Sequence, residues 1–334
     1  MNRRKDQTLI FEFPPVISGR GAVVGKKEGE GPLGKYFDYI TKDDKFGEKS
    51  WETAERRFIL ESLRTAMRKA SLDAGDIDFF FGGDLLDQCG GSNYALREIS
   101  RPFFGLYGAC STMAEGMALG AMTVAGGFAD NVIAVTSSHF CSSERQFRYP
   151  LEYGSTRPPT SQWTVTGSGA VVISRSGRGV RINSATAGKI IDLGIKDTNN
   201  MGAAMAPAAL DTIISHFEAT GKDFSDYDLV LTGDLGYLGN KLLGEMLWEN
   251  GYDCGDKLKD CGMLIFDRER QDVHCGGSGC GCSATALAGY ILERMEEGSL
   301  GKVLFTATGA LMSTTLSRQG ETIPGIAHAV ELEV

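Results

Sequence analysis

Two segments near the start of the chain carry the periodicities of an amphipathic helix and a buried strand. From residue 53 to residue 70, apolar residues recur at helical spacing and charged residues occupy the other faces. The apolar positions are Ile59, Leu63, Ala66, Met67 and Ala70. Residues 76–85 then read D-I-D-F-F-F-G-G-D-L, an apolar run bounded by Asp and Gly. Such a run predicts a buried strand of parallel type.

The same order of patterns recurs later in the chain. A helical pattern over 207–217 precedes D-Y-D-L-V-L-T-G-D-L at 226–235, whose Asp, Gly and Leu positions match those of 76–85. Residues 110–135 and 282–305 form a second matched pair. Each has Cys and Ser, a helical run of small residues, a Gly and an apolar strand, in that order. The chain is therefore expected to contain one α/β pattern twice.

A third match, between T-G-S-G-A-V-V at 166–172 and T-G-A-L at 308–311, is expected to close each half. Alternating strands and helices in both halves predict an α/β fold, with packed sheets and with helices between and outside them. The Ser-, Gly- and Arg-rich stretch near 174–181 predicts the boundary. We therefore expect an N-terminal half over 1–175 and a C-terminal half over 176–334.

Composition narrows the class of protein. The formal net charge of −9 argues against nucleic acid as a main partner. The eight cysteines show neither the spacing of a disulfide framework nor that of an ordinary zinc site. A reducing compartment, no metal and no cofactor are therefore expected. The first residues lead into no secretory signal and no stretch is long enough to span a bilayer, so membrane association is expected to run through a partner protein.

Cys110 is the leading candidate for chemistry. It stands in Y-G-A-C-S-T at 107–112, between an apolar stretch and a run of small helix-forming residues. A thiol at the start of a helix lies near free backbone N–H groups and the positive end of the helix dipole, which favour thiolate over thiol. The alternative is a small buried apolar residue, the usual role of a free cysteine.

Four glycine-containing stretches carry a resemblance to a known superfamily. They are G-A-C-S at 108–111, T-G-S-G-A at 166–170, S-G-C-G-C-S at 278–283 and T-G-A at 308–310. With the doubled pattern, they resemble the thiolase superfamily, which includes the thiolases and the ketoacyl synthases. The resemblance implies a duplicated, thiolase-like α/β fold with five αβαβα layers.

Two longer stretches resemble one non-standard group of that superfamily, the stage V sporulation AD family of spore-forming bacteria. They are F-G-L-Y-G-A-C-S-T-M-A-E-G at 104–116 and G-G-S-G-C-G-C-S-A at 276–284. This resemblance implies binding of dipicolinic acid, with or without calcium, and its uptake into the developing spore with membrane proteins of the same operon. It also implies a peripheral location at the spore inner membrane, on its cytoplasmic face or forespore side. A homodimer is implied because superfamily members usually pair through the first-half sheet.

The resemblance also shows where the catalytic groups of condensing enzymes would stand, and most are missing. The His that follows the second-half strand falls at Gly233, which has no side chain to handle protons or polarise a carbonyl. The Asn or His of the later Gly loop falls at Ser278, or at His274 in another register. The second Cys of the thiolases falls at Ala307. Cys110 remains as a vestigial nucleophile position, and the chain is expected not to be an enzyme.

An insertion after the strand that ends at residue 138 combines arginine with aromatic residues. Bidentate Arg–carboxylate pairing and ring stacking are what a flat pyridine dicarboxylate would need. The alternative is a dimer interface, where the same residue types are enriched. The expected ligand-binding side chains are Cys110, His139, Arg145, Arg148, Trp163 and Ser278.

Three functions follow from these patterns. The leading hypothesis is a non-catalytic dipicolinic-acid-binding protein that takes part in dipicolinate uptake into the spore. The alternative is a condensing-type acyltransferase, like a ketoacyl synthase or thiolase, with Cys110 as its nucleophile. The third is a structural scaffold, which the retained glycine loops disfavour.

Overall fold

The computed structural model describes residues 2–147 and 156–334, and its strand order reads alike from both ends. One hydrogen-bonded path of strands runs β12-β11-β14-β15-β10-β3-β9-β7-β5-β6. Within each half of this path, strands that are connected through helices pair in parallel, such as β5 with β7 and β11 with β14. The last strand of each half, β9 or β15, then pairs antiparallel. The halves join where β10 meets β3 over two residue pairs.

The elements of the first half follow the order that the sequence pattern predicts. Its main elements are β3 (Val16–Val24), α2 (Trp51–Ala70), β5 (Phe79–Gly83), α3 (Gly90–Ile99), β6 (Phe103–Gly105), α4 (Thr112–Ala125), β7 (Asn131–Ser138) and β9 (Gly167–Ser174). Its smaller elements are β1 (Arg3–Lys5), β2 (Thr8–Ile10), α1 (Lys26–Gly29), η1 (Gly34–Tyr36), β4 (Tyr39–Ile40), η2 (Ala74–Asp76), η3 (Asp87–Cys89), η4 (Ala109–Ser111), α5 (Phe140–Phe147) and β8 (Trp163–Thr164).

The second half repeats this order. Its main elements are β10 (Val180–Thr186), α6 (Met201–Thr220), β11 (Leu229–Thr232), α7 (Gly236–Glu249), β12 (Leu258–Asp260), α9 (Cys280–Thr285), α10 (Leu292–Glu296), β14 (Lys302–Ala310) and β15 (Gly325–Glu333). Its smaller elements are η6 (Phe224–Asp226), α8 (Cys261–Leu264), β13 (Gly277–Ser278), the π-helical turn η7 (Ala286–Ile291) between α9 and α10, and α11 (Thr314–Arg318).

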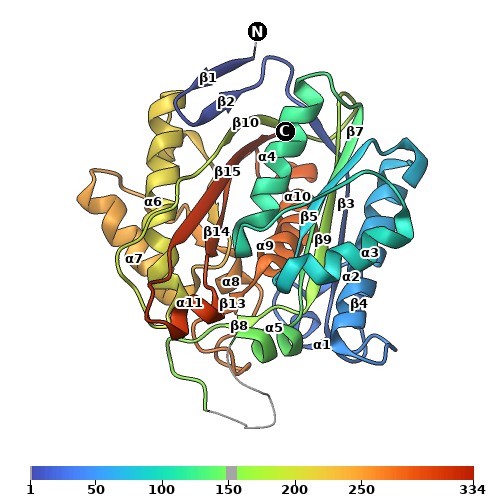
Figure 1. Ribbon diagram of the computed structural model, residues 1–334. Helices are drawn as coiled ribbons and strands as arrows, with labels where there is room; N and C mark the ends of the chain where they lie inside the picture. Colours follow the sequence, from blue (N-terminus) through green and yellow to red (C-terminus); the bar gives the residue numbers. More distant parts are fainter. Residues whose placement is uncertain (1, 148–155) are drawn as a thin grey trace.

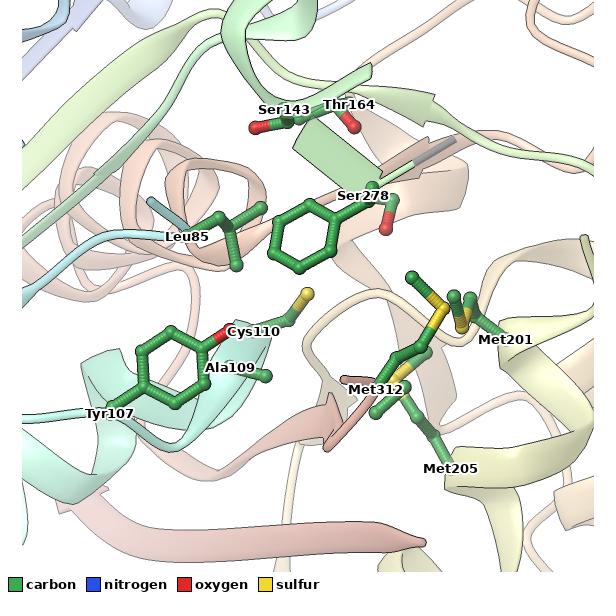
Figure 2. A pocket seen from close by; sticks show the side chains of 12 residues that line it. Leu85, Tyr107, Ala109, Cys110, Ser143, Thr164, Met201, Met205, Ser278 and Met312 are labelled. Atoms are coloured by element: carbon green, nitrogen blue, oxygen red, sulfur yellow. The ribbon is translucent and has the colours of Figure 1, made fainter. Parts of the chain in front are cut away.

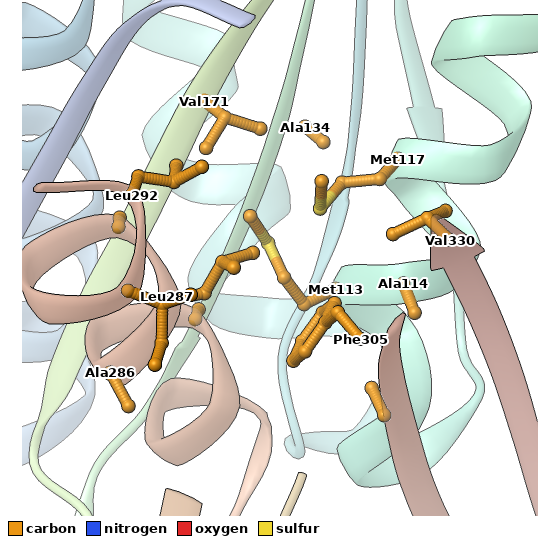
Figure 3. Packing of buried hydrophobic residues seen from close by; sticks show 14 of the residues in the cluster. Met113, Ala114, Met117, Ala134, Val171, Ala286, Leu287, Leu292, Phe305 and Val330 are labelled. Carbon is orange, nitrogen blue, oxygen red and sulfur yellow. The ribbon is translucent and has the colours of Figure 1, made fainter. Parts of the chain in front are cut away.

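Helices cover the outside of both halves and also lie between them (Figure 1). α2 and α3 pack on the first-half strands, α6 and α7 on the second-half strands, and α4 contacts strands of both halves. Three apolar clusters fill these layers, and the central one joins α4 and the α9–α10 segment to both sets of strands. In this central cluster, Met113 and Met117 of α4 face Leu287, Leu292 and Phe305 (Figure 3). The predicted thiolase-like α/β fold is confirmed.

Two details of the predicted repeat differ from the structure. The counterpart of β9 in the strand order is β15, whereas residues 308–310 lie at the end of β14. The third match was therefore wrong, because its T-G pair stands at the start of β9 in the first half but near the end of β14 in the second. The second outer helix also begins at Met201 rather than at Pro207, and Pro207 lies inside it. The division into residues 1–175 and 176–334 stays a prediction.

Within residues 2–147 and 156–334, no helix has the length and apolar character needed to cross a bilayer.

Candidate functional site

Cys110 lies in the short helical turn η4, directly before the central helix α4. The end of β14 packs tightly against this turn: a Cβ on Gly309 would stand 2.3 Å from the carbonyl oxygen of Gly108. Ala109 adopts a left-handed backbone conformation, with φ of 49°. The glycine in the T-G-A stretch is therefore required by the close approach of the second half to the Cys110 turn.

A buried carboxylate, Asp234, faces the thiol from the second half. Its Oδ2 accepts hydrogen bonds from Ser278 Oγ (3.0 Å) and Gly279 N (2.8 Å), and its Oδ1 accepts one from Thr308 Oγ1 (3.0 Å). The carboxylate also acts on the Cys110 thiol, whose pKa it raises. Asp234 therefore ties the Cys110 turn to the two glycine loops of the second half.

This environment keeps Cys110 in the thiol form. Burial raises the pKa of Cys110 well above its usual value, and the carboxylate of Asp234 raises it further because it repels a thiolate. The hydrogen bond from Gly279 N acts in the opposite direction but is the smallest contribution. The expectation that the helix start would favour the thiolate was wrong, since burial and Asp234 outweigh the helix end.

The cavity over Cys110 is narrow and mostly apolar. Its free volume is about 60 Å³, small beside the 300–1,000 Å³ typical of pockets for drug-sized ligands. Figure 2 shows the thiol pointing into the space between Leu85 and the methionines. Among the described residues that line it, none is Lys, Arg or His. The lining residues are Leu85, Tyr107, Ala109, Cys110, Ser143, Phe147, Thr164, Met201, Met205, Ser278, Ala310 and Met312.

The position expected for a catalytic histidine leaves little room for a side chain. A Cβ on Gly233 would stand 3.0 Å from Thr308 N, 3.1 Å from Ala307 Cα and 3.4 Å from Ser283 Cβ. Ala307 itself is fully buried. The site therefore lacks a proton-transferring group at Gly233 for steric as well as chemical reasons.

Of the two candidates for the later glycine loop, Ser278 lines the cavity and His274 does not. Ser278 is held against Asp234, and the next residue, Gly279, has φ of 97°. His274 is half-buried outside this cavity, with Nε2 3.3 Å from Oδ1 of Asp272. The register that places Ser278 opposite Cys110 is the one that the structure has.

His139 does not reach the cavity. It is fully buried, its Nε2 donates to the carbonyl oxygen of Asp44 (2.6 Å), and its Nδ1 accepts from Cys141 N (3.2 Å). Burial lowers its pKa, which favours the neutral ring. Both ring nitrogens are thus used by the backbone, and the expected role of His139 in binding a carboxylate is not supported.

Arg145 and Trp163 lie in two other hollows. Arg145 forms an ion pair with Glu52 and lies over the ring of Trp51. Trp163 and Thr164 are neighbours on β8, and only Thr164 faces Cys110. The expected convergence of these side chains on the thiol is therefore not found. Arg148 lies outside the described residues.

The sequence pattern does not reveal that Asp234 lies beside Cys110 and holds Ser278, which lines the cavity. An Asp at the end of a strand is usually a turn or cap residue, and this pattern predicts no other role for Asp234. The available signal was its place in the repeat, where Asp84 is its first-half counterpart. Asp84 accepts from Leu86 N (2.9 Å) and Ser92 N (2.7 Å), as a turn-forming Asp does. Only the packing of the two halves makes Asp234 different.

The described residues contain no cluster of His, Cys, Asp and Glu side chains that could hold a metal ion. The crowded segment from His274 to Cys282 does not form one, since its thiols are used elsewhere. Cys280 Sγ donates to the carbonyl oxygen of Ser137 (2.9 Å), and Cys282 Sγ lies 3.7 Å from that of Gly233.

Comparisons with known proteins agree with this architecture. Solved structures with the same fold include OleA of Xanthomonas campestris with cerulenin bound (14% identity, 97% of this chain and 100% of that chain covered, TM-score 0.62). Another is 3-oxoacyl-[acyl-carrier-protein] synthase III of Aquifex aeolicus VF5 (14% identity, 96% and 100% covered, TM-score 0.58). At this identity the likeness concerns the fold alone.

A much closer relative exists in sequence. The chain is 47% identical over 327 residues to stage V sporulation protein AD of Bacillus subtilis (strain 168), covering 98% of this chain and 96% of that protein. The family model for stage V sporulation protein AD matches residues 5–333. The chain therefore belongs to the stage V sporulation protein AD family.

Proposed function

We propose that this protein acts in sporulation as a non-catalytic binder of dipicolinic acid and takes part in its uptake into the developing spore. Membership of a sporulation family supports the setting. Two observations carry the non-catalytic part. Asp234 raises the pKa of Cys110, and the closely surrounded Gly233 supplies no side chain for proton transfer. A condensing enzyme needs a thiolate and a proton-handling partner, and neither is favoured here.

The cavity over Cys110 is the proposed place for the pyridine ring. Its walls combine apolar side chains, which suit a flat ring, with the hydroxyl groups of Ser143 and Thr164, which suit carboxylate oxygens. The free volume is small, so the side chains of Phe147 and Met312 must move to admit the ligand. We further propose a peripheral place at the spore inner membrane, beside membrane proteins of the same operon. We propose that calcium binds only together with dipicolinate.

Calorimetry tests the proposal directly. Dipicolinate, acetyl-CoA and malonyl-CoA are titrated separately into the protein, and acyl transfer to Cys110 is followed by mass spectrometry. We expect heat with dipicolinate, none with the two thioesters, and no acyl adduct. Dipicolinate should also raise the melting temperature, because a ligand that binds only the folded state stabilises it.

A pair of substitutions locates the site. Ala310→Leu adds bulk inside the cavity and is expected to weaken dipicolinate binding about tenfold or more, since a leucine side chain fills most of the free space. Ala74→Leu, on the outside of the first half, is the matched control and should bind as wild type does. Absence of binding by the wild type, or a Cys110 acyl adduct formed from a thioester, would sink the proposed function.

A further inference from the structure

A second cluster of chemistry lies on the other side of β8. Trp163 faces a groove of about 640 Å³ that is separate from the cavity over Cys110. Phe140 stacks on the indole of Trp163, with ring centroids 3.7 Å apart and planes at 6°. Lys27 Nζ lies 3.3 Å from the indole centroid, and the Arg157 guanidinium carbon lies 4.8 Å from it. Because Phe140 covers one face at van der Waals distance, Lys27 must cover the other.

The two cations lie together with few acceptors. Lys27 Nζ and Arg157 Nη2 both donate to the backbone carbonyl of Asp272, at 3.1 and 2.8 Å. Arg157 Nη1 is buried and has no hydrogen-bond partner. Two neighbouring cations with a shared neutral acceptor repel each other and leave donors unused, which is costly away from bulk water.

Carboxylates compensate for this charge only in part: Asp272, Glu28 and Glu30 each raise the pKa of Lys27, but burial and the charge of Arg157 outweigh them. The Asp272 side chain pairs with Arg157 (2.7 Å) and with His274 (3.3 Å), yet it is 76% exposed. Burial lowers the pKa of the Lys27 ammonium, and the charge of Arg157 lowers it further. The first effect reflects the loss of water around the ammonium group, and the second reflects the closeness of the two cations.

The backbone around the cluster is fixed by polar contacts. Gln271 Nε2 donates to the carbonyl oxygen of Lys27 (2.7 Å). The next residue, Glu28, is buried and accepts from Thr166 N (2.9 Å) through its side chain. These bonds tie α1 to segments more than 130 residues away, so the ammonium group is positioned without a ligand. Preorganised donors of this kind lower the entropy cost of binding an anion.

We propose that Lys27 and Arg157 form an anion-binding subsite over Trp163 that takes one carboxylate group of a small organic acid. This deepens the proposed function, on which it rests for the identity of the acid: it is a second, outer site for dipicolinate beside the cavity over Cys110. The acid binds through its charge rather than through ring stacking, because both faces of Trp163 are already covered. Carboxylate side chains also line this groove, so the subsite is confined to the part next to Trp163 and Lys27, and Arg157 lies beside the groove rather than in its lining. The carboxylates are those of Glu28, Glu30, Asp43, Asp44 and Asp272.

Trp163 gives the test a local signal. The chain has three tryptophans, and a Trp51→Phe, Trp248→Phe background leaves Trp163 as the only one. Dipicolinate is titrated into this protein, and Trp163 fluorescence is followed together with binding heat. Benzoate and inorganic phosphate serve as comparison probes. We expect a saturable fluorescence change with dipicolinate and benzoate that weakens as salt increases.

Lys27→Met and Arg157→Met should each weaken the fluorescence-detected binding about tenfold, as expected for loss of a charge-assisted hydrogen bond. Lys26→Met is the matched control. It removes the same charge from the same short helix, but Lys26 pairs with Glu30 and is not among the cations over Trp163. Equal weakening by Lys26→Met and Lys27→Met would overturn the subsite, since binding would then depend on the overall positive charge of this surface and not on the position of Lys27.

The two proposals fail in different ways. If Ala310→Leu removes dipicolinate binding while Lys27→Met and Arg157→Met leave both signals unchanged, the subsite is wrong and the proposed function stands. If dipicolinate gives no response but benzoate still changes Trp163 fluorescence in a Lys27-dependent manner, the subsite stands and its proposed ligand is wrong. A response to phosphate equal to that to benzoate would contradict the preference for a carboxylate.

Discussion

Cys110 lies where the sequence places it, but its chemical environment is the reverse of the expected one. The N-terminus of α4 by itself would favour the thiolate form of Cys110. In the folded chain, the second half closes over the turn and brings Asp234 against the sulfur. Position in a motif therefore does not determine reactivity. The residue that decides it comes from the other half of the repeat.

The first prediction concerns this pair of side chains. Asp234→Asn removes the negative charge that repels a thiolate, so the pKa of Cys110 should fall and its alkylation by iodoacetamide at pH 8 should become faster, by about threefold or more. Peptide mass spectrometry measures the modified fraction of Cys110 over time. Cys254, which is partly exposed and lies on another part of the chain, is the internal reference. An unchanged ratio of the two rates would show that Asp234 does not set the state of the thiol.

Only part of the candidate site could be predicted from the sequence. Cys110 and Ser278 line one cavity, as their glycine motifs predict, because the local geometry of each follows from its motif; their role in binding stays a prediction. His139 could not be placed in this way. Its partner, the carbonyl oxygen of Asp44, lies 95 residues away in a segment without a clear pattern. Contacts of this kind depend on tertiary packing, which local periodicity does not encode.

At the scale of elements, the buried strands and outer helices were the easiest to predict. The apolar run that forms β5 and its counterpart in β11 differ sharply from their surroundings, and α2 has one apolar face. The start of α6 was missed because Gly202 and Ala206 give no apolar stripe, and because Pro207 usually marks the first turn of a helix. The small residues there serve close packing: a Cβ on Gly202 would stand 2.4 Å from the carbonyl oxygen of Leu235.

The edge strand β6 is the element on which the second prediction rests. Among the described strands, β6 pairs only with β5 and ends the strand order. Phe104 on this strand is 52% exposed and stacks on Phe81 from the same sheet. An open edge with an exposed aromatic residue favours pairing with another chain. The homodimer implied by the superfamily resemblance is therefore proposed to form through β6.

Phe104→Lys places a charge on this edge and is expected to shift the protein from dimer to monomer, as measured by size-exclusion chromatography with light scattering. Phe128→Lys is the control, because Phe128 is 80% exposed at the end of α4 and has no place on the sheet edge. Circular dichroism verifies that both variants are folded. A wild-type monomer, or a Phe104→Lys dimer as stable as the wild type, would refute an interface at β6.

At the scale of the whole molecule, several carboxyl groups are buried between layers, and no ion pair joins them to a cation of residues 2–147 or 156–334. Burial raises the pKa of Glu28 and Asp260 to about 7 and that of Glu55 to about 8. Glu331 shows the opposite case. Hydrogen bonds from His216, Lys222 and Tyr227 outweigh its burial and hold its pKa below the usual range. Protonation at low pH removes the stabilisation that the charged Glu331 provides. A rise in pH instead ionises the buried carboxyl groups of Glu28, Asp260 and Glu55.

The pH dependence of stability follows from these directions. An acid whose pKa is raised by folding binds a proton more tightly in the folded state, so stability falls as pH rises from the unfolded pKa to the folded one. For Glu55 this window runs from 4.5 to about 8. Stability should therefore be greatest under mildly acidic conditions and decline toward pH 8. Glu331, with its lowered pKa, contributes a loss only as the pH falls below its usual value.

Glu55→Gln tests the basic side of this profile. Glu55 accepts from Ser137 Oγ (3.0 Å) and Ser142 Oγ (3.1 Å), and a glutamine of the same shape remains neutral at every pH. Relative to wild type, the variant should therefore gain about 1–3 kcal/mol in free energy of unfolding between pH 5 and pH 8. Urea unfolding at both pH values measures it. Glu61→Gln changes an exposed carboxylate on the same helix and should leave the difference between the two pH values as in wild type. A parallel offset of Glu55→Gln at both pH values would mean that Glu55 is ionised in the folded protein, and that α2 and α5 are joined by a charged group.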